Sequence, residues 1–161
     1  HLKAKEAEAL LSQASEKLKT SMEQLLKGKV DVEVVQADFA EVYLFNGRPL
    51  LTKTEGKIFP TLVFTEFLAS APKAVVDMGA VPHVCNGANI MAPGIRRYEG
   101  EFGKVDFLVV IDEKHGKPLA IGEAMYDNVE AGKVKHGAVI VNVHFVGDRV
   151  WNFIKSFESK S

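Results

Sequence analysis

Two residues could support nucleophilic chemistry by their type and spacing, because His83 and Cys85 stand two positions apart. A neighbouring imidazole can act as the base that activates a cysteine thiol. Side chains two positions apart on a helix do not face each other, however, and cysteine is commonly a small buried apolar residue. The pattern therefore does not predict a catalytic cysteine.

The other reactive residues do not form a known catalytic or metal-binding pattern. The chain has a single cysteine, and its histidines form no HExxH motif, so a zinc site is not predicted. Glu123 and Asp127 lack the arrangement of a paired acid and base. Residues 87–94 are glycine-rich but lack the Gly-Lys-Ser/Thr ending of a phosphate-binding loop. We expect a protein that is not an enzyme and that holds no metal or cofactor.

Residues 77–97 are the most distinctive stretch, because glycine and proline recur there between two apolar runs. Both residue types mark places where the backbone takes conformations that others resist. We expect a short helix over residues 79–86, with Asp77 as its N-cap and Gly87 just past its end. Residues 88–94 should continue as an extended segment whose small side chains let a ligand approach the main chain. The alternative interpretation is a tight crossover inside a small β-barrel.

The elements that must position this stretch begin with a helical N-terminal end. Apolar residues recur at three- and four-residue spacing from Ala7 to Leu26, which predicts a helix that Gly28 ends. A break near residues 12–15, giving two helices, is the alternative. A short apolar helix is expected over residues 62–68.

Strands are expected between these helices, over residues 32–37 and 40–45, which are rich in Val, Tyr and Phe. Asn46-Gly47 is the strongest short hairpin signal in the chain. Pro49 early in the returning strand favours an edge position in the sheet, because proline cannot donate to a neighbouring strand. Residues 69–72, small side chains followed by a proline, predict a domain boundary.

The C-terminal part is predicted to be rich in strands. Residues 105–111 are almost all apolar, which is typical of a strand covered on both faces. Apolar residues alternate over residues 139–145, so Asn142 and His144 should share one face of their strand. Residues 150–153 are expected to close the sheet. Short strands, glycine-rich turns and one small helix favour a closed or nearly closed barrel.

Several ordered blocks of this C-terminal part resemble the PUA domain, the RNA-binding fold named for pseudouridine synthases and archaeosine transglycosylases. The blocks run in the family's order through most of the last 85–90 residues, and together they are far more specific than a single glycine motif. They are residues 76–80, 87–95, 105–112, 116–124, 132–133 and 137–151.

Residues 55–62, Glu-Gly-Lys-Ile-Phe-Pro-Thr-Leu, narrow the resemblance. They are similar to the pre-PUA segment of the malignant-T-cell-amplified-sequence family, whose eukaryotic members pair with density-regulated protein in translation. The chain resembles an archaeal relative of that family. The resemblance implies an α+β fold in which an N-terminal α/β pre-PUA domain, residues 1–72, is followed by a small mixed β-barrel PUA domain, residues 73–155, and a tail, residues 156–161.

The resemblance also implies that RNA lies across the glycine-rich loop, the small helix and the last strands. Matching positions for contact with RNA are Gly79, Ala88, Asn89, Ala92, Pro93 and Gly94. Nearby cations expected to contact phosphates are Arg96, Arg97, Lys133, Lys135 and His136, with ordinary solvated charge as the alternative. Asn89 could both donate and accept hydrogen bonds. Ile90 and Met91 match too but are expected in the core, and Tyr98 and Tyr126 are candidate rings for base stacking.

Charge limits how strongly this surface can bind RNA. The net charge of the chain is −1, and residues 70–161 carry eleven basic and eleven acidic side chains. RNA-binding proteins usually have a basic footprint, so any contact must come from a local patch and should be modest without a larger assembly. The single cysteine and the absence of an apolar run near ~20 residues favour a cytoplasmic protein.

The resemblance implies a role in translation, with tRNA or rRNA as the ligand and the small ribosomal subunit, the 3′ end of tRNA and a protein partner as contacts. It implies no binding to DNA or to a membrane. Two alternatives stay open. One is a protein-interaction module in which residues 1–69 dock a partner, and the other is an accessory subunit of an RNA-modifying complex.

Overall fold

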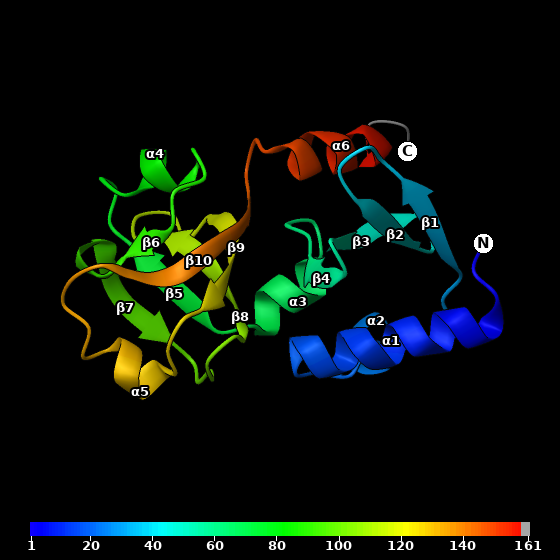
Figure 1. Ribbon diagram of the computed structural model, residues 1–161, viewed down its shortest axis with the longest axis horizontal. Helices are drawn as coiled ribbons and strands as arrows, with labels where there is room; N and C mark the ends of the chain where they lie inside the picture. Colours follow the sequence, from blue (N-terminus) through cyan, green and yellow to red (C-terminus); the bar gives the residue numbers. More distant parts are fainter. Residues whose placement is uncertain (159–161) are drawn as a thin grey trace. The chain divides into compact units, whose positions relative to one another are not determined.

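The computed structural model describes residues 1–158, and these divide into two compact units (Figure 1). The N-terminal unit comprises residues 1–67 and the segment from Arg149 onward, and the C-terminal unit comprises residues 68–148. The predicted domains, residues 1–72 and 73–155, differ from this division at both boundaries. Residues 68–72 belong with the C-terminal unit, and residues 149–155 belong with the N-terminal unit. Of the predicted tail, residues 159–161 lie outside the described residues.

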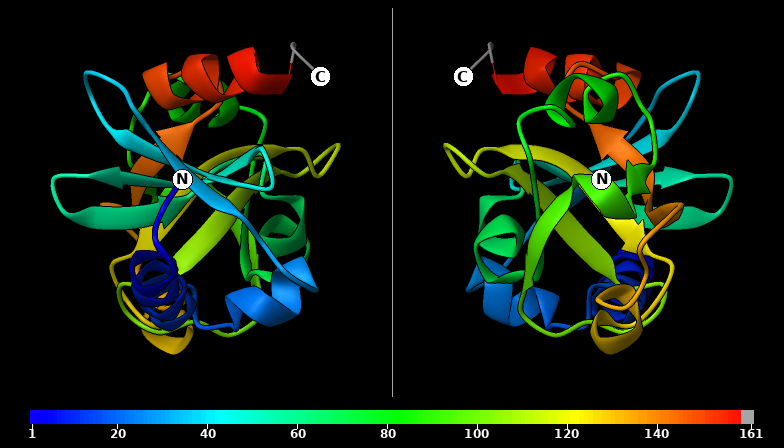
Figure 2. Two further views of the ribbon diagram at one scale, coloured as in Figure 1. Left: turned by 90° about the vertical axis from the view of Figure 1, so that its right-hand side faces the viewer. Right: turned by 90° about the vertical axis from the view of Figure 1, so that its left-hand side faces the viewer.

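The N-terminal unit is an antiparallel sheet of order β1-β2-β3-β4 with helices on both faces. Helix α1 contacts β4 and helix α6 contacts β3, and Figure 2 shows α1 and α6 on opposite sides of the sheet. The elements are α1 (Ala4–Leu18), α2 (Met22–Leu26), β1 (Val32–Gln36), β2 (Glu41–Phe45), β3 (Arg48–Thr54), β4 (Lys57–Pro60), α3 (Thr65–Ser70), which spans the boundary between the units, and α6 (Arg149–Glu158).

Two helices form at the N-terminus, as the alternative prediction had it, but the break lies later than predicted. Leu10, Ala14 and Leu18 repeat every four residues and are buried, so they define the inner face of α1. The helix ends where Lys19 takes a left-handed conformation with φ 59°. Ser21 then starts α2 by accepting a hydrogen bond from the Gln24 main-chain N–H. The chain therefore breaks between the two helices and not near residues 12–15.

The hairpin prediction is confirmed, and the edge prediction for Pro49 is wrong. Asn46 and Gly47, with φ 52° and 83°, join β2 to β3 in the left-handed conformation that such turns need. Strand β3 nevertheless lies inside the sheet, between β2 and β4. The register shifts between Tyr43 and Leu44, opposite Pro49. Proline is tolerated at such an irregularity because the regular ladder is already interrupted there.

The C-terminal unit is a six-stranded sheet of order β6-β10-β9-β8-β5-β7, in which only the β5–β8 pair is parallel. Helices α4 and α5 lie at opposite ends of it (Figure 1). The elements are β5 (Lys73–Val76), α4 (Val81–Val84), β6 (Ile90–Met91), the 3₁₀ helix η1 (Ala92–Gly94), β7 (Ile95–Glu99), β8 (Phe107–Asp112), β9 (Pro118–Ala124), α5 (Asn128–Ala131) and β10 (Ala138–Phe145).

This sheet curls because its two edge strands follow one another in the chain. Strands β6 and β7 lie at opposite ends of the strand order, yet only η1 separates them in sequence. A connection of three residues holds the two edges close, so the sheet wraps around a core that includes Leu108, Val110 and Ile140. The predicted α+β fold, with a small barrel-like sheet after an α/β unit, is confirmed as a half-barrel.

Two predictions about the last strands are wrong. Residues 150–153 do not close the sheet but lie in α6, where Val150 and Ile154, four residues apart, are buried on one face. The predicted alternation in β10 is broken by an irregular register between Asn142 and His144. His144 is consequently fully buried, and its Nδ1 lies 2.9 Å from a carboxylate oxygen of Asp148.

Within residues 1–158, no helix combines the length and the apolar character that crossing a membrane requires.

Candidate nucleic-acid interface

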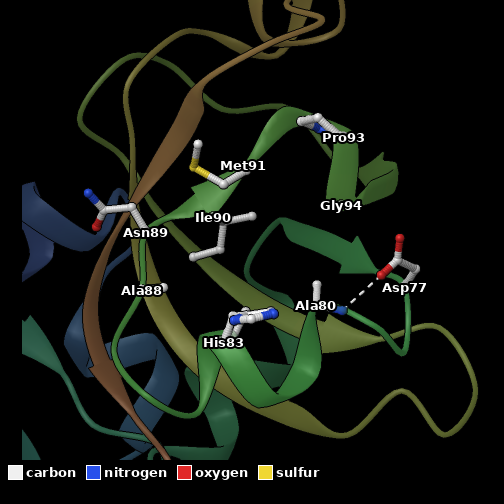
Figure 3. A pocket seen from close by; sticks show the side chains of 10 residues that line it. Asp77, Ala80, His83, Ala88, Asn89, Ile90, Met91, Pro93 and Gly94 are labelled. Atoms are coloured by element: carbon white, nitrogen blue, oxygen red, sulfur yellow. Dashed lines mark hydrogen bonds between the residues drawn. The ribbon is translucent and has the colours of Figure 1, made fainter.

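The glycine-rich stretch, which comprises residues 77–94, surrounds a pocket of about 470 Å³ in the C-terminal unit. One wall is the turn and helix that carry Asp77, Ala80 and His83, and the other is the segment around Ile90 and Met91 (Figure 3). The lining is completed by Val84, Ala88, Asn89, Pro93 and Gly94. Four of the residues predicted to contact RNA therefore lie around one pocket, namely Ala88, Asn89, Pro93 and Gly94.

Hydrogen bonds hold the two walls at their base. The Asp77 carboxylate accepts a hydrogen bond from the Ala80 N–H at 2.9 Å, and the Asp77 N–H donates to the Gly94 carbonyl at 3.0 Å. A β-carbon on Gly94 would lie 3.3 Å from that of Ala80, tighter than an ordinary contact. The helix is shorter than predicted, with Ala80 in place of Asp77 at its N-cap, although Asp77 caps the turn that precedes it.

Two asparagines fix the flank of the pocket that faces β10. The Asn142 side-chain amide donates to the carbonyls of Val84 and Ala88, both at 3.0 Å. The Asn142 main-chain N–H in turn donates to Oδ1 of Asn89 at 2.9 Å. An N–H group needs an oxygen acceptor, so this bond decides which way the Asn89 amide points. Asn89 therefore presents its NH₂ group outward as a donor, and its oxygen is already engaged.

A carboxylate links the other flank of the pocket to a cation. Glu113, just after β8, accepts a hydrogen bond from the Met78 N–H at 2.8 Å and one from Nε of Arg96 at 3.1 Å. The side chain of Arg96 is 59% exposed. Arg97 pairs with Glu99 on its own strand, at 3.0 Å, and has no such link to the glycine-rich stretch. The two arginines predicted as one patch therefore have different surroundings.

The remaining predicted cations lie on the segment between α5 and β10. Lys133 is exposed and pairs with Glu130 at 3.4 Å. The segment is joined to the glycine-rich stretch by the Ala92 N–H, which donates to the Gly137 carbonyl at 2.8 Å. Lys135 and His136 are exposed next to this junction. The structure thus brings this segment next to η1. Gly79 and Ala92, which were also predicted to contact RNA, lie beside the pocket and do not line it.

The predictions for the apolar and aromatic residues of the site have different outcomes. Ile90 is buried as expected, but Met91 is 48% exposed because its side chain lies on the outer face of the short strand β6. Tyr98 is only half-exposed and packs against Phe102 with ring centroids 5.4 Å apart, and burial raises the pKa of its phenol. Tyr126 is exposed but does not line the pocket. Met91 is therefore a better candidate than either tyrosine for contact with a base.

Three residues that help form the site were not predicted from the sequence. Glu113 acts from just after β8, Asn142 acts from β10, and His83 lines the pocket from α4. An acid 35 positions from Met78 gives no local signal, and neither does an amide 53 positions from Asn89. His83 stood in the reactive pair that the sequence singled out, but its place in a pocket wall follows only from the fold.

The pair His83 and Cys85 has no feature of an activated nucleophile. The Cys85 thiol is half-buried, and desolvation raises its pKa, which is the direction opposite to activation. Within residues 1–158, no three His, Cys, Asp or Glu side chains are grouped so that they could hold a metal ion.

The curled sheet, the glycine-rich stretch and its pocket define a protein with a PUA domain. The family model described as "PUA domain" matches residues 72–146. A second model, described as a domain of unknown function (DUF1947), matches residues 1–66. The chain belongs to the family of malignant T-cell-amplified sequence 1 and translation machinery-associated protein 20. The predicted resemblance is thereby confirmed.

Relatives in archaea and eukaryotes match across most of the chain. An uncharacterized protein of Methanocaldococcus jannaschii is 34% identical and is covered over 83% of each chain. Translation machinery-associated protein 20 of Saccharomyces cerevisiae is 30% identical over 85% of this chain and 80% of its own. Malignant T-cell-amplified sequence 1 of Danio rerio is also 30% identical, over 81% of this chain and 76% of its own.

Solved structures show the same fold. A hypothetical protein of Pyrococcus horikoshii is 31% identical, with a TM-score of 0.79 and coverage of 95% of this chain and 97% of that chain. A PUA domain of Aeropyrum pernix, solved as a tartrate complex, is 25% identical, with a TM-score of 0.82 and coverage of 96% and 89%.

Proposed function

We propose that this chain is a non-enzymatic RNA-binding protein that works in translation, with the pocket of the glycine-rich stretch as its RNA site. The ligand is tRNA or rRNA, and the 3′ end of tRNA and the small ribosomal subunit are the contacts we propose. Support for the role in translation comes from the names of the relatives, which include translation machinery-associated protein 20. Support for RNA as the ligand comes from the PUA domain.

The observation that carries this proposal is the composition of the pocket and its rim. The wall is apolar and exposed at Ala88, Met91 and Pro93, and a flat base can pack there. Two outward donors stand at different flanks of the stretch, the Asn89 amide and the Arg96 guanidinium. Unpaired RNA offers an apolar base face together with phosphate and carbonyl acceptors, which is the combination that these groups fit.

The charge of the chain sets the expected strength. Arg96, Arg97, Lys133, Lys135 and His136 are the cations predicted to contact phosphates, and three of them already have acidic partners. Few phosphates can therefore be neutralised, so binding to free RNA should be modest and should depend weakly on salt. This favours a protein that acts within an assembly, where other surfaces add to its affinity.

A salt titration of tRNA binding tests the proposal. The intact chain is titrated with deacylated tRNA and with tRNA trimmed at its 3′ end, and wild type is compared with the Arg96→Ala, Arg97→Ala double variant. We expect weaker binding to trimmed tRNA, and in the double variant weaker binding with a salt slope that is shallower by about 1–2. Absence of binding to either tRNA by the wild-type chain would remove tRNA as the ligand of this pocket, and the same titration with small-subunit rRNA would then decide whether the pocket binds RNA.

The alternative in which residues 1–69 dock a protein has less support in the described residues. Val34, 38% exposed, is the only large apolar side chain of residues 1–69 that is more than about a third exposed in the described structure. A docking surface usually shows a contiguous apolar patch of several hundred Å². The exposed valines and methionines otherwise lie in the C-terminal unit.

A further inference from the structure

An irregularity in strand β7 gives Arg96 a special position. Strand β5 pairs with β7 so that Val76 lies opposite Ile95 and Val75 lies opposite Arg97. Arg96 is the additional residue between these pairs and has no partner in the ladder. A bulge of this kind changes the direction of a side chain, and bulges are over-represented beside functional sites.

Glu113 receives the redirected arginine and at the same time holds the start of the glycine-rich stretch. One of its oxygens, Oε1, accepts from Nε of Arg96 at 3.1 Å, and the other, Oε2, accepts from the Met78 N–H at 2.8 Å. The Glu113 main-chain N–H donates to the Val76 carbonyl at 2.9 Å, which fixes the residue against the end of β5. Glu113 thus connects the bulge and the glycine-rich stretch through its carboxylate, and its main chain holds it at the end of β5.

The pairing with Glu113 leaves the two terminal NH₂ groups of Arg96 available to a ligand. Glu113 contacts Nε, and the described structure gives the terminal NH₂ groups of Arg96 no carboxylate partner. The two terminal groups form the fork that can grip a phosphate. Arg97 also uses Nε, but toward Glu99 on the same strand, so its side chain is not tied to the glycine-rich stretch.

We propose that Glu113 is a positioning residue of the RNA site, which orients the fork of Arg96 toward a phosphate that lies along the glycine-rich stretch. This inference rests on the proposed function, since it concerns how the same site binds RNA. Glu113 is not itself expected to touch RNA, because both of its oxygens face protein donors. Arg96 and not Arg97 is then the arginine that matters for affinity.

The sign of one substitution separates this role from simple electrostatics. Glu113→Gln removes a negative charge beside a site for phosphates, so electrostatics alone predicts tighter binding. The glutamine oxygen can still accept from the Met78 N–H, but its NH₂ group cannot accept from Arg96. Positioning therefore predicts weaker binding in spite of the more favourable charge.

The experiment measures the affinity of the full chain for deacylated tRNA at fixed salt. We expect Glu113→Gln to weaken binding about three- to tenfold and Arg96→Ala to weaken it about tenfold. The matched control is Glu101→Gln, which removes the same charge from an exposed residue of the same unit and should leave affinity unchanged or slightly higher. Arg97→Ala should cost less than Arg96→Ala.

A double-variant cycle separates positioning from a general loosening of the loop. If Glu113 acts through Arg96, Glu113→Gln adds no further loss when Arg96 is already alanine. Equal losses in both backgrounds would show that Glu113 acts only through the loop, and unchanged or tighter binding of Glu113→Gln would show no positioning; either result overturns the inference. Failure of the wild-type chain to bind either tRNA or rRNA would instead overturn the proposed function.

Discussion

Two arginine–glutamate pairs, one in each unit, use different edges of the guanidinium group. In the N-terminal unit, the terminal nitrogens of Arg48 donate to both oxygens of Glu66, at 2.7 and 2.6 Å, so the fork is closed by protein. In the C-terminal unit, Arg96 meets Glu113 through Nε alone, at 3.1 Å. A closed fork can only join two parts of the protein, whereas an open fork is available to a ligand.

The comparison also shows what these pairs do not do. Both arginines are exposed, with 44% and 59% of their side chains accessible. Exposed ion pairs contribute little to stability, because water and salt screen the attraction. We therefore expect the uncharged Asn142 amide to contribute more to the stability of the glycine-rich stretch than the ion pair between Arg96 and Glu113 does. The predictions below, ordered from the largest expected effect to the smallest, test this difference.

Asn142→Ala is expected to have the largest effect. The substitution leaves the carbonyls of Val84 and Ala88 without the donor that each now has at 3.0 Å. Loss of two such bonds in a partly buried site costs about 2 kcal/mol of unfolding free energy. The measurement is the urea midpoint of unfolding. Asn86→Ala, at an exposed amide on the same loop, is the control and should change stability by less than about 0.5 kcal/mol.

Asn89→Asp should affect RNA binding more than folding. Aspartate keeps an oxygen for the Asn142 N–H, which Asn89 now accepts at 2.9 Å. It replaces the outward NH₂ donor with a carboxylate oxygen, which repels phosphate. We expect about tenfold weaker tRNA binding, equivalent to about 1.4 kcal/mol, with an unchanged urea midpoint. Compared with Asn89→Asp, Asn89→Ala should lower the unfolding free energy more and weaken tRNA binding less. If Asn89→Ala instead weakened tRNA binding as much as Asn89→Asp or more, the Asn89 amide would not act as an outward donor.

Most of the fold could be predicted from the sequence where the signals were local. Asn46-Gly47 marked its hairpin correctly because left-handed backbone geometry favours those two residue types. Residues 150–153 were assigned to a strand because apolar residues in a short run do not distinguish a strand from a helix. Their burial repeats every four residues at Val150 and Ile154, a pattern visible only with the neighbouring elements in place.

The site was less predictable than the fold because its parts come from distant segments. Ala88, Asn89, Pro93 and Gly94, which were predicted to contact RNA, all line one pocket because they lie within one stretch. Glu113 could not be anticipated, because its two partners lie 35 and 17 positions away. Whether any of these residues contacts RNA remains a prediction.

Arg96→Lys tests whether the fork matters apart from its charge. Lysine keeps the charge but cannot contact Glu113 through one edge while gripping a phosphate with the other. We expect binding to weaken about threefold, with the salt slope unchanged because the same number of phosphates is neutralised. The matched control, Arg97→Lys, should change affinity less. Equal effects at the two positions would remove the distinction between Arg96, which Glu113 holds beside the glycine-rich stretch, and Arg97, which pairs with Glu99 on its own strand.

Glu66→Gln probes the closed fork and should have the smallest effect. The Arg48 hydrogen bonds hold the pKa of Glu66 at about 2, below its usual 4.5. Because the folded pKa is the lower one, the pair stabilises the protein above about pH 4.5 and loses this contribution as the pH falls toward about 2. Both side chains are substantially exposed, so screening limits the difference between wild type and variant at neutral pH to under about 1 kcal/mol.

The measurement for this pair is the difference in urea midpoint between wild type and Glu66→Gln at several pH values. The difference should be largest near neutral pH and should be mostly lost by about pH 2, where half of the wild-type carboxylates are protonated in the folded state. Glu8→Gln, at an exposed residue of α1, should show no such pH dependence. A difference that persists at the lowest pH would mean that Glu66 stabilises α3 by packing, and the closed fork would then not be the feature that separates the two pairs.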